Sequence, residues 1–125
     1  MRPVSLAVLA LAELIGTAAA QPMIRAPAAT DTLAIVTHVD VLPDHMTAAR
    51  DALAAYVRAA RGEPGALRVE AMQEVRQNHF DLVETWRDEA AWRAHQASAA
   101  SLELRRTVGP WLGSPIDERI GTPLG

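Results

Sequence analysis

The segment DLVETWRDEAAWRAHQAS, residues 81–98, concentrates side chains that could carry out chemistry. It holds two of the three Trp and one of the four His in a 125-residue chain that has only one Tyr and one Phe. An imidazole is a natural proton acceptor near neutral pH, because its ordinary pKa is about 6.5. An indole can form an apolar wall and donate one N–H. These residues either fill a core or line a cavity in which a substrate reacts.

The spacing of these residues divides them between a strand and a helix. Glu84 and Trp86 are two residues apart in a strand pattern and so share one face of it. Trp92 and His95 are three apart in the helical pattern that follows and share a face of that helix. Trp86 is then a core residue or a cavity wall. His95 is a structural histidine or a catalytic base.

Two further candidates precede this segment. His38 lies in a strand pattern, and it points into the cavity if its face of the strand meets the helices. Tyr56 lies on the apolar side of a helical pattern, where we expect a core residue with its hydroxyl at the pocket edge. We expect His45 and His79 to face solvent. Metal catalysis is not expected, because the four His lack paired ligand spacing and no carboxylate cluster accompanies them.

The elements that position these residues alternate between strand and helix. Period-2 patterns predict strands over residues 33–41, 66–75, 80–86 and 115–121. Two helical patterns are predicted, one capped by Asp44 and one capped by Asp88, and a further helical piece opens at Ser101. The order is β-α-β-β-α-β, an α+β ferredoxin-like arrangement. The first strand is apolar on both faces and one helical layer covers only one of them, which predicts a homodimer.

Composition excludes several classes of function. The length fits one compact domain, and a net charge of −3 gives no electrostatic case for nucleic-acid binding. The absence of Cys excludes disulfides, thiolate nucleophiles and Cys-based metal sites.

The N-terminal segment is typical of an export signal. Residues 1–20 combine a basic start, an apolar run and small residues at Ala18 and Ala20, although Glu13 places a charge within the run. The run is too short for a membrane span. We expect cleavage after Ala20, a periplasmic or secreted protein, a linker over residues 21–32 and a folded domain over residues 33–125.

The order and spacing of the motifs resemble the antibiotic biosynthesis monooxygenase (ABM) domain family, which includes quinol monooxygenases. The resemblance extends over residues 33–124, nearly all of the mature chain, and includes the turn EPGAL at 63–67 and HVDVLPDH at 38–45. Its main signature comprises Glu84, Trp86, Asp88, Trp92, Ala94, His95 and Ser98.

The resemblance implies a dimeric α+β barrel. It also implies oxygenation of a small aromatic quinol or phenolic substrate by O2, without metal, flavin or haem. A site of this kind needs a proton acceptor and donors for an oxyanion. His95, with His38 in reserve, and Trp86 are the catalytic candidates, and Trp92, Tyr56 and Glu84 are the substrate-binding candidates.

The chain also departs from family patterns. Many members follow the signature with Pro-His-aromatic, where this chain has ASAASLEL. The haem-degrading branch places a Trp at the position of His95 and a His at that of Arg105, which argues against haem cleavage. The alternative function is a non-catalytic dimeric barrel that binds an apolar small molecule or serves in stress response.

Overall fold

The computed structural model describes residues 24–125, so the predicted export signal lies outside the described residues. The strands are β1 (Leu33–Asp40), β2 (Ala66–Gln73), β3 (His79–Trp86) and β4 (Asp117–Gly121). The helices are α1 (Met46–Ala60), α2 (Glu89–Gln96) and α3 (Ala99–Val108), with 3-10 turns at Pro43–His45 and Gly109–Trp111. None of the described helices is long and apolar enough to cross a membrane.

The four strands form one sheet in the order β2-β3-β1-β4, and all neighbours are antiparallel. β2 and β3 follow each other in the chain and pair as an antiparallel hairpin. The predicted α+β ferredoxin-like fold is confirmed.

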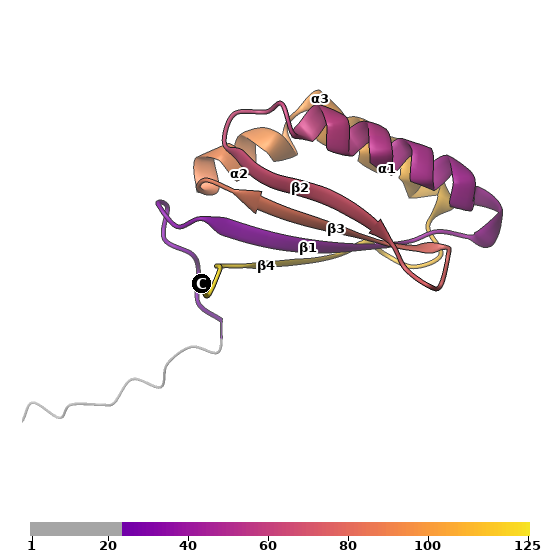
Figure 1. The fold of residues 1–125 in the computed structure, drawn as a ribbon, viewed down its shortest axis with the longest axis horizontal. Coiled ribbons are helices and arrows are strands. Elements are labelled where there is room, and N and C mark those ends of the chain that lie inside the picture. The colour runs from indigo at the N-terminus through magenta and orange to yellow at the C-terminus, as the bar shows by residue number, and fades with distance from the viewer. Residues whose placement is uncertain (1–23) are drawn as a thin grey trace, which may run out of the picture.

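All three helices lie on one face of the sheet (Figure 1). Burial alternates along β1 and β3, because neighbouring side chains of a strand point to opposite faces. The helix-facing side chains of these two strands form the core with one face of each helix. Those contributed by the two strands are Leu33, Ile35, Thr37, Val39, Phe80, Leu82, Glu84 and Trp86.

The other face of the sheet is not covered by any described element (Figure 1). Val36 on β1 is 47% exposed and Met72 on β2 is 54% exposed. Because these apolar side chains face away from the helices, this open face of the sheet is a candidate surface for association.

Two helix starts differ from the sequence-based prediction. Asp44 does not cap α1, because Pro43 begins a 3-10 turn that includes Asp44, and no side chain caps the helix after it. The α3 helix begins at Ala99, since the hydroxyl of Ser98 accepts the backbone N–H of Ser101 and caps the helix two residues earlier than expected. Asp88 caps α2 as predicted and accepts the N–H of Ala91 at 2.9 Å.

Candidate active site

A hydrogen-bonded path of four polar side chains lies between the sheet and the helices. The Tyr56 hydroxyl lies 2.7 Å from Glu84 Oε1 and 2.7 Å from His95 Nε2. The other ring nitrogen of His95, Nδ1, lies 2.8 Å from Glu63 Oε2. Three of the four residues are buried, with His95 and Glu84 each only 2% exposed. The result is a continuous hydrogen-bonded path from a buried carboxyl to Glu63, which borders solvent.

Three elements and a turn position this path. Tyr56 lies on the buried side of α1, Glu84 on the helix-facing side of β3, and His95 on the buried side of α2. Glu63 lies in the turn between α1 and β2. Because Glu84 and His95 are far in sequence from Tyr56 and Glu63, only the folded chain brings the four residues together.

Gly65 allows the turn that carries Glu63 to approach α2 closely. Its φ is +82°, and a Cβ at this position would lie 2.4 Å from the Cβ of Ala91. The Gly65 carbonyl also accepts the N–H of Arg87 at 2.8 Å. Glycine is required here both for the left-handed backbone and for the space.

Glu63 is a site residue that was not predicted from the sequence. The EPGAL segment that carries it contributes to the family resemblance, and a carboxylate in a tight turn was the only available signal. Its distance from His95 depends on how the turn packs on α2, which a sequence pattern does not give.

The two Trp residues of the opening segment both lie against His95. The Trp86 ring stacks on the imidazole at a centroid distance of 4.2 Å and an interplanar angle of 23°. The Trp92 ring is 5.5 Å from the imidazole. The indole N–H of Trp86 is buried near enough to Glu84 to favour the ionised carboxylate, but among residues 24–125 it meets no acceptor at hydrogen-bond geometry.

A small cavity of about 20 Å³ adjoins these residues. Its lining includes His95, Glu84, Tyr56 and Trp92. Trp86 is not among the lining residues, so of its two possible roles, core residue or cavity wall, the structure supports the core residue, whose ring stacks on the imidazole. The volume suits about one water molecule, and an aromatic substrate needs more room than this cavity provides.

A larger groove of about 340 Å³ lies between α1 and α3. Small side chains such as Ala52, Ala55 and Ala100 line it. Tyr56 and Leu104 line both the groove and the inner cavity. These two side chains therefore form the boundary between a surface groove and the buried polar path.

Burial controls the charge states of the path. Burial raises the pKa of Glu84, and the hydrogen bond from Tyr56 opposes this shift only in part. Burial, followed by the negative charge of Glu84, raises the pKa of Tyr56 far above its ordinary range. Tyr56 therefore keeps its proton and acts in hydrogen bonding rather than as an anion.

The path can hold its protons in two ways without gaining or losing one. In the first, a neutral Glu84 donates to Tyr56, Tyr56 donates to His95 Nε2, and His95 Nδ1–H donates to Glu63. In the second, Tyr56 donates to an ionised Glu84, and a charged His95 donates to Tyr56 and Glu63. Burial of Glu84 shifts the balance toward the first arrangement, in which a ring nitrogen of His95 accepts the proton of the Tyr56 hydroxyl.

His38 does not join this path. It lies on the open face of the sheet, because it alternates with Thr37 and Val39, which face the helices. The condition under which His38 would point into the cavity, that its face of the strand meets the helices, is therefore not met. The hydrogen bond with Asp81, at 2.7 Å, is the largest cause that raises the pKa of His38.

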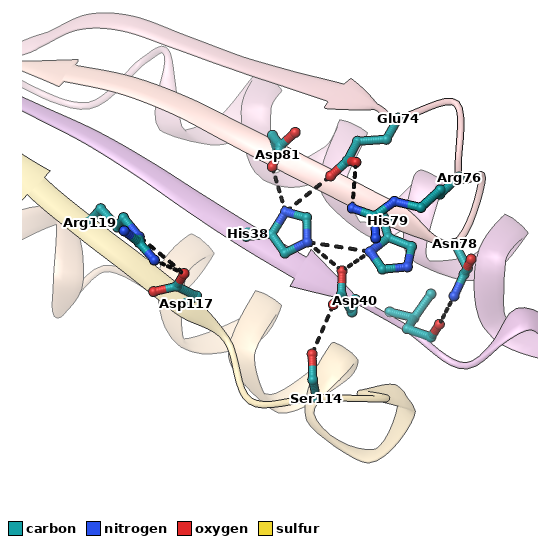
Figure 2. Close-up of polar contacts among 11 residues, drawn as sticks. His38, Asp40, Glu74, Arg76, Asn78, His79, Asp81, Ser114, Asp117 and Arg119 are labelled. Carbon is teal, nitrogen blue, oxygen red and sulfur yellow. Dashed lines mark hydrogen bonds and ion pairs between the residues drawn. The ribbon is translucent and has the colours of Figure 1, made fainter.

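His79 also differs from expectation. It lies beside His38 on the open face, within a cluster that includes Asp40, Glu74 and Asp81 (Figure 2). The expectation that no carboxylate cluster accompanies the His residues is thus wrong, because strand pairing assembles such a cluster.

Trp111 and His45 pack on each other away from the polar path. Their rings are stacked at 5.3 Å with an interplanar angle of 8°. The carbonyl of Trp111 accepts the N–H of Leu42 at 2.8 Å, which fastens the C-terminal segment to the loop after β1.

The fold and the buried path define an α+β protein of ferredoxin-like topology with a polar site beneath its helices. Residues 32–107 match the model of the family named Antibiotic biosynthesis monooxygenase. The chain belongs to this family, as its resemblance predicted.

Solved structures share the fold. Rv0793 from Mycobacterium tuberculosis is 26% identical, with a TM-score of 0.71 over 75% of this chain and 96% of that one. PA3566 from Pseudomonas aeruginosa is 25% identical, with a TM-score of 0.71 over 79% of this chain and 100% of that one. A protein named antibiotic biosynthesis monooxygenase shares the fold at 18% identity, with a TM-score of 0.70 over 74% of this chain and 99% of that one.

A curated mouse protein, N-terminal EF-hand calcium-binding protein 3, is 34% identical over 77 residues. These residues are 62% of this chain but only 22% of the mouse protein. The similarity thus concerns one part of a much longer protein.

Proposed function

We propose that this protein is a cofactor-independent monooxygenase that oxidises a small aromatic quinol or phenolic substrate with O2. The observation that carries the proposal is the path from Glu84 through Tyr56 to His95, which places a proton acceptor and a proton donor together in a dry, aromatic environment. Membership of the monooxygenase family supports the reaction class.

The groove between α1 and α3 is the proposed entry site for the substrate ring. Its Ala-rich lining offers a flat apolar surface, and Tyr56 and Leu104 separate it from the buried cavity. Displacement of the Leu104 side chain would join the two spaces. A substrate hydroxyl at this boundary would reach the Tyr56 hydroxyl first.

His95 is the proposed base, and it acts through Tyr56. As Tyr56 receives the substrate proton it passes its own proton to His95 Nε2, and Glu63 stabilises the charged imidazole through Nδ1. The resulting electron-rich anion can donate an electron to O2. Trp86, stacked on the imidazole, keeps water from it and holds its orientation.

The proposed reaction balances without an external reductant. A hydroquinone and O2 give a hydroxyquinone and water, so one oxygen atom enters the ring and the substrate supplies all the electrons. No metal or flavin is required for this balance.

Labelled oxygen tests the proposal. Chelator-treated protein would be incubated under ¹⁸O2 with hydroquinones, naphthoquinols and anthrones. We expect enzyme-dependent oxygen uptake with at least one substrate class, and one labelled atom in the product. Uptake no faster than autoxidation for every substrate would contradict the proposal and favour the non-catalytic alternative.

The groove assignment has its own matched test. Ala100→Trp should fill the groove and raise KM, whereas Ala99→Trp, on the exposed side of the same helix turn, should leave KM unchanged. Equal effects of the two substitutions would mean that the substrate enters elsewhere.

A further inference from the structure

We propose that the open face of the sheet carries a binding site for a divalent transition-metal ion, formed by His38, His79, Asp40 and Glu74. The site lies on the opposite side of the sheet from the Tyr56–His95 path. It goes beyond the proposed oxygenase activity and does not depend on it.

Strand pairing builds this site from two His-x-Asp segments. His38 and Asp40 lie two apart on β1, and His79 and Asp81 lie two apart on β3, so each pair shares the open face. The antiparallel register places His38 opposite Asp81 and Asp40 opposite His79. The two imidazoles therefore sit diagonally across a square whose other corners are carboxylates.

The ligand atoms already converge. His38 Nε2 lies 3.4 Å from His79 Nδ1 and 2.7 Å from Asp40 Oδ1, and Asp40 Oδ1 also contacts His79 Nδ1. A potential ligand atom from each of His38, His79 and Glu74 lies within 4.8 Å of the others. Tetrahedral zinc with bonds of about 2.1 Å separates its ligand atoms by about 3.4 Å, so small side-chain movements would complete the coordination.

Asp40 is arranged as a ligand rather than as a surface charge. Its Oδ2 accepts a hydrogen bond from Ser114 at 2.9 Å, which fixes the carboxylate (Figure 2). Its Oδ1 is buried and accepts no hydrogen bond at normal geometry among the described residues, although two imidazole nitrogens lie next to it. A metal ion bound between Asp40 Oδ1, His38 Nε2 and His79 Nδ1 would give each of these three atoms a bonding partner.

The surroundings supply the support that metal-bound histidines usually have. Asp81 Oδ1 lies 2.7 Å from His38 Nδ1, the nitrogen that would not bind the ion (Figure 2). A carboxylate in this position fixes the ring and its tautomer. Glu74 Oε2 lies 3.1 Å from the same Nδ1, and its Oε1 accepts a hydrogen bond from Arg76 at 3.0 Å, so Glu74 would turn away from Nδ1 to take the fourth position. In the single chain the side chains of the proposed ligands keep 18–29% of their surface exposed, so an ion can reach them there from solvent.

The donor set selects the class of ion. Two imidazoles with carboxylates suit Zn²⁺, Co²⁺ and related ions, whereas Mg²⁺ and Ca²⁺ prefer oxygen ligands only.

Metal titration of the untagged, chelator-stripped protein tests the proposal. Calorimetry with Zn²⁺ should show saturable binding of one ion per chain, and Co²⁺ should develop a visible absorption band. A tenfold excess of Mg²⁺ or Ca²⁺ should not displace Zn²⁺. Zn²⁺ should also raise the thermal midpoint of the wild type, because it binds the folded state.

Variants assign the ligands. His79→Ala and Asp40→Asn should each weaken Zn²⁺ binding at least tenfold, and Asp81→Asn should weaken it about 10- to 100-fold through its support of His38. His45→Ala, which removes a histidine outside the cluster, should bind like the wild type. Absence of saturable binding, or wild-type affinity in both His79→Ala and Asp40→Asn, would overturn the proposal. Circular dichroism of each variant separates loss of a ligand from loss of the fold, and the wild-type titration stands without the variants.

Discussion

Tyr56 is the residue on which the buried polar path depends. Its single hydroxyl serves both Glu84 and His95, each at 2.7 Å. Tyr56→Phe should lower the free energy of unfolding by about 1–3 kcal/mol, because it leaves buried polar groups without a partner. Urea unfolding measures this change.

Thr37→Val is a matched control for this substitution. The Thr37 hydroxyl is also buried next to the cavity but has no hydrogen-bond partner within the described part of the chain. Its removal should change stability much less than Tyr56→Phe. Equal losses for the two variants would show that Tyr56 contributes nothing through its hydroxyl bonds.

Glu84 makes a distinct contribution to the pH dependence of stability. Burial raises the pKa of Glu84 above its ordinary value of 4.5, so the folded chain holds this proton to higher pH than the unfolded chain. Its contribution to stability is therefore greatest below pH 4.5 and falls as pH rises toward the folded-state pKa. Glu84→Gln cannot ionise and so does not lose stability in this way. The free energy of unfolding of Glu84→Gln, compared with that of the wild type, should therefore increase with pH.

Unfolding measured between pH 4 and pH 8 tests the sign of this effect. Glu103→Gln is the control, because the hydrogen bond from Arg106 lowers the pKa of Glu103 and the expected slope is opposite and small on the exposed helix surface. A stability difference between Glu84→Gln and wild type that is flat, or that falls with pH, would contradict a raised pKa for Glu84.

At the scale of elements, the turn between α1 and β2 sets the position of α2. Gly65→Ala places a Cβ 2.4 Å from the Ala91 Cβ and strains a backbone with φ of +82°. We expect a loss of at least about 1–3 kcal/mol in stability. The His95–Glu63 contact should also be disturbed, because the turn and the helix must move apart.

Gly62→Ala is the control for the same turn. A Cβ at Gly62 meets only the Ala59 carbonyl, at 3.6 Å, so little change in thermal midpoint is expected. If both variants unfold at the same temperature, the close approach at Gly65 does not position α2.

The elements themselves could be read from the sequence because each has a local cause. Alternation predicted the strands, and Asp88 predicted the start of α2. The start of α1 was missed because Pro43 favours a 3-10 turn whose extent depends on packing. Local patterns also cannot show which face of β1 meets the helices, and for this reason the sequence does not decide on which side of the sheet His38 lies.

At the scale of the whole molecule, the open face of the sheet predicts association. Val36 and Met72 are about half exposed there, on a face that no described helix covers. We expect a homodimer with sheet packed against sheet, as the family resemblance implies. Light scattering at micromolar concentration should give twice the mass of the chain.

A pair of surface variants tests which face associates. Val36→Glu should dissociate the dimer, because it places a charge at the centre of the open face. Leu102→Glu, on the exposed side of α3 where Leu102 is 58% exposed, should remain dimeric. A monomer in the wild type, or dissociation only by Leu102→Glu, would contradict a dimer through the sheet.

The candidate site was only partly predictable. Trp92 and His95 share a helix face by spacing alone, and the family signature marks Glu84 and Trp86. The contacts of Tyr56 and Glu63 with His95 depend on three-dimensional packing between distant segments. The two His-x-Asp segments were visible in the sequence, but only the β1–β3 register shows that they meet.

In the proposed reaction, His95 accepts the substrate proton through Tyr56. General-base catalysis is typically worth about 10²–10⁴ in rate. The most direct measurement is oxygen uptake by His95→Ala on a substrate that the wild type oxidises, with His45→Ala as control and circular dichroism to verify the fold. His95→Ala should lose activity by about that factor, and His45→Ala should lose none. Full activity in a folded His95→Ala variant would show that His95 is not the base.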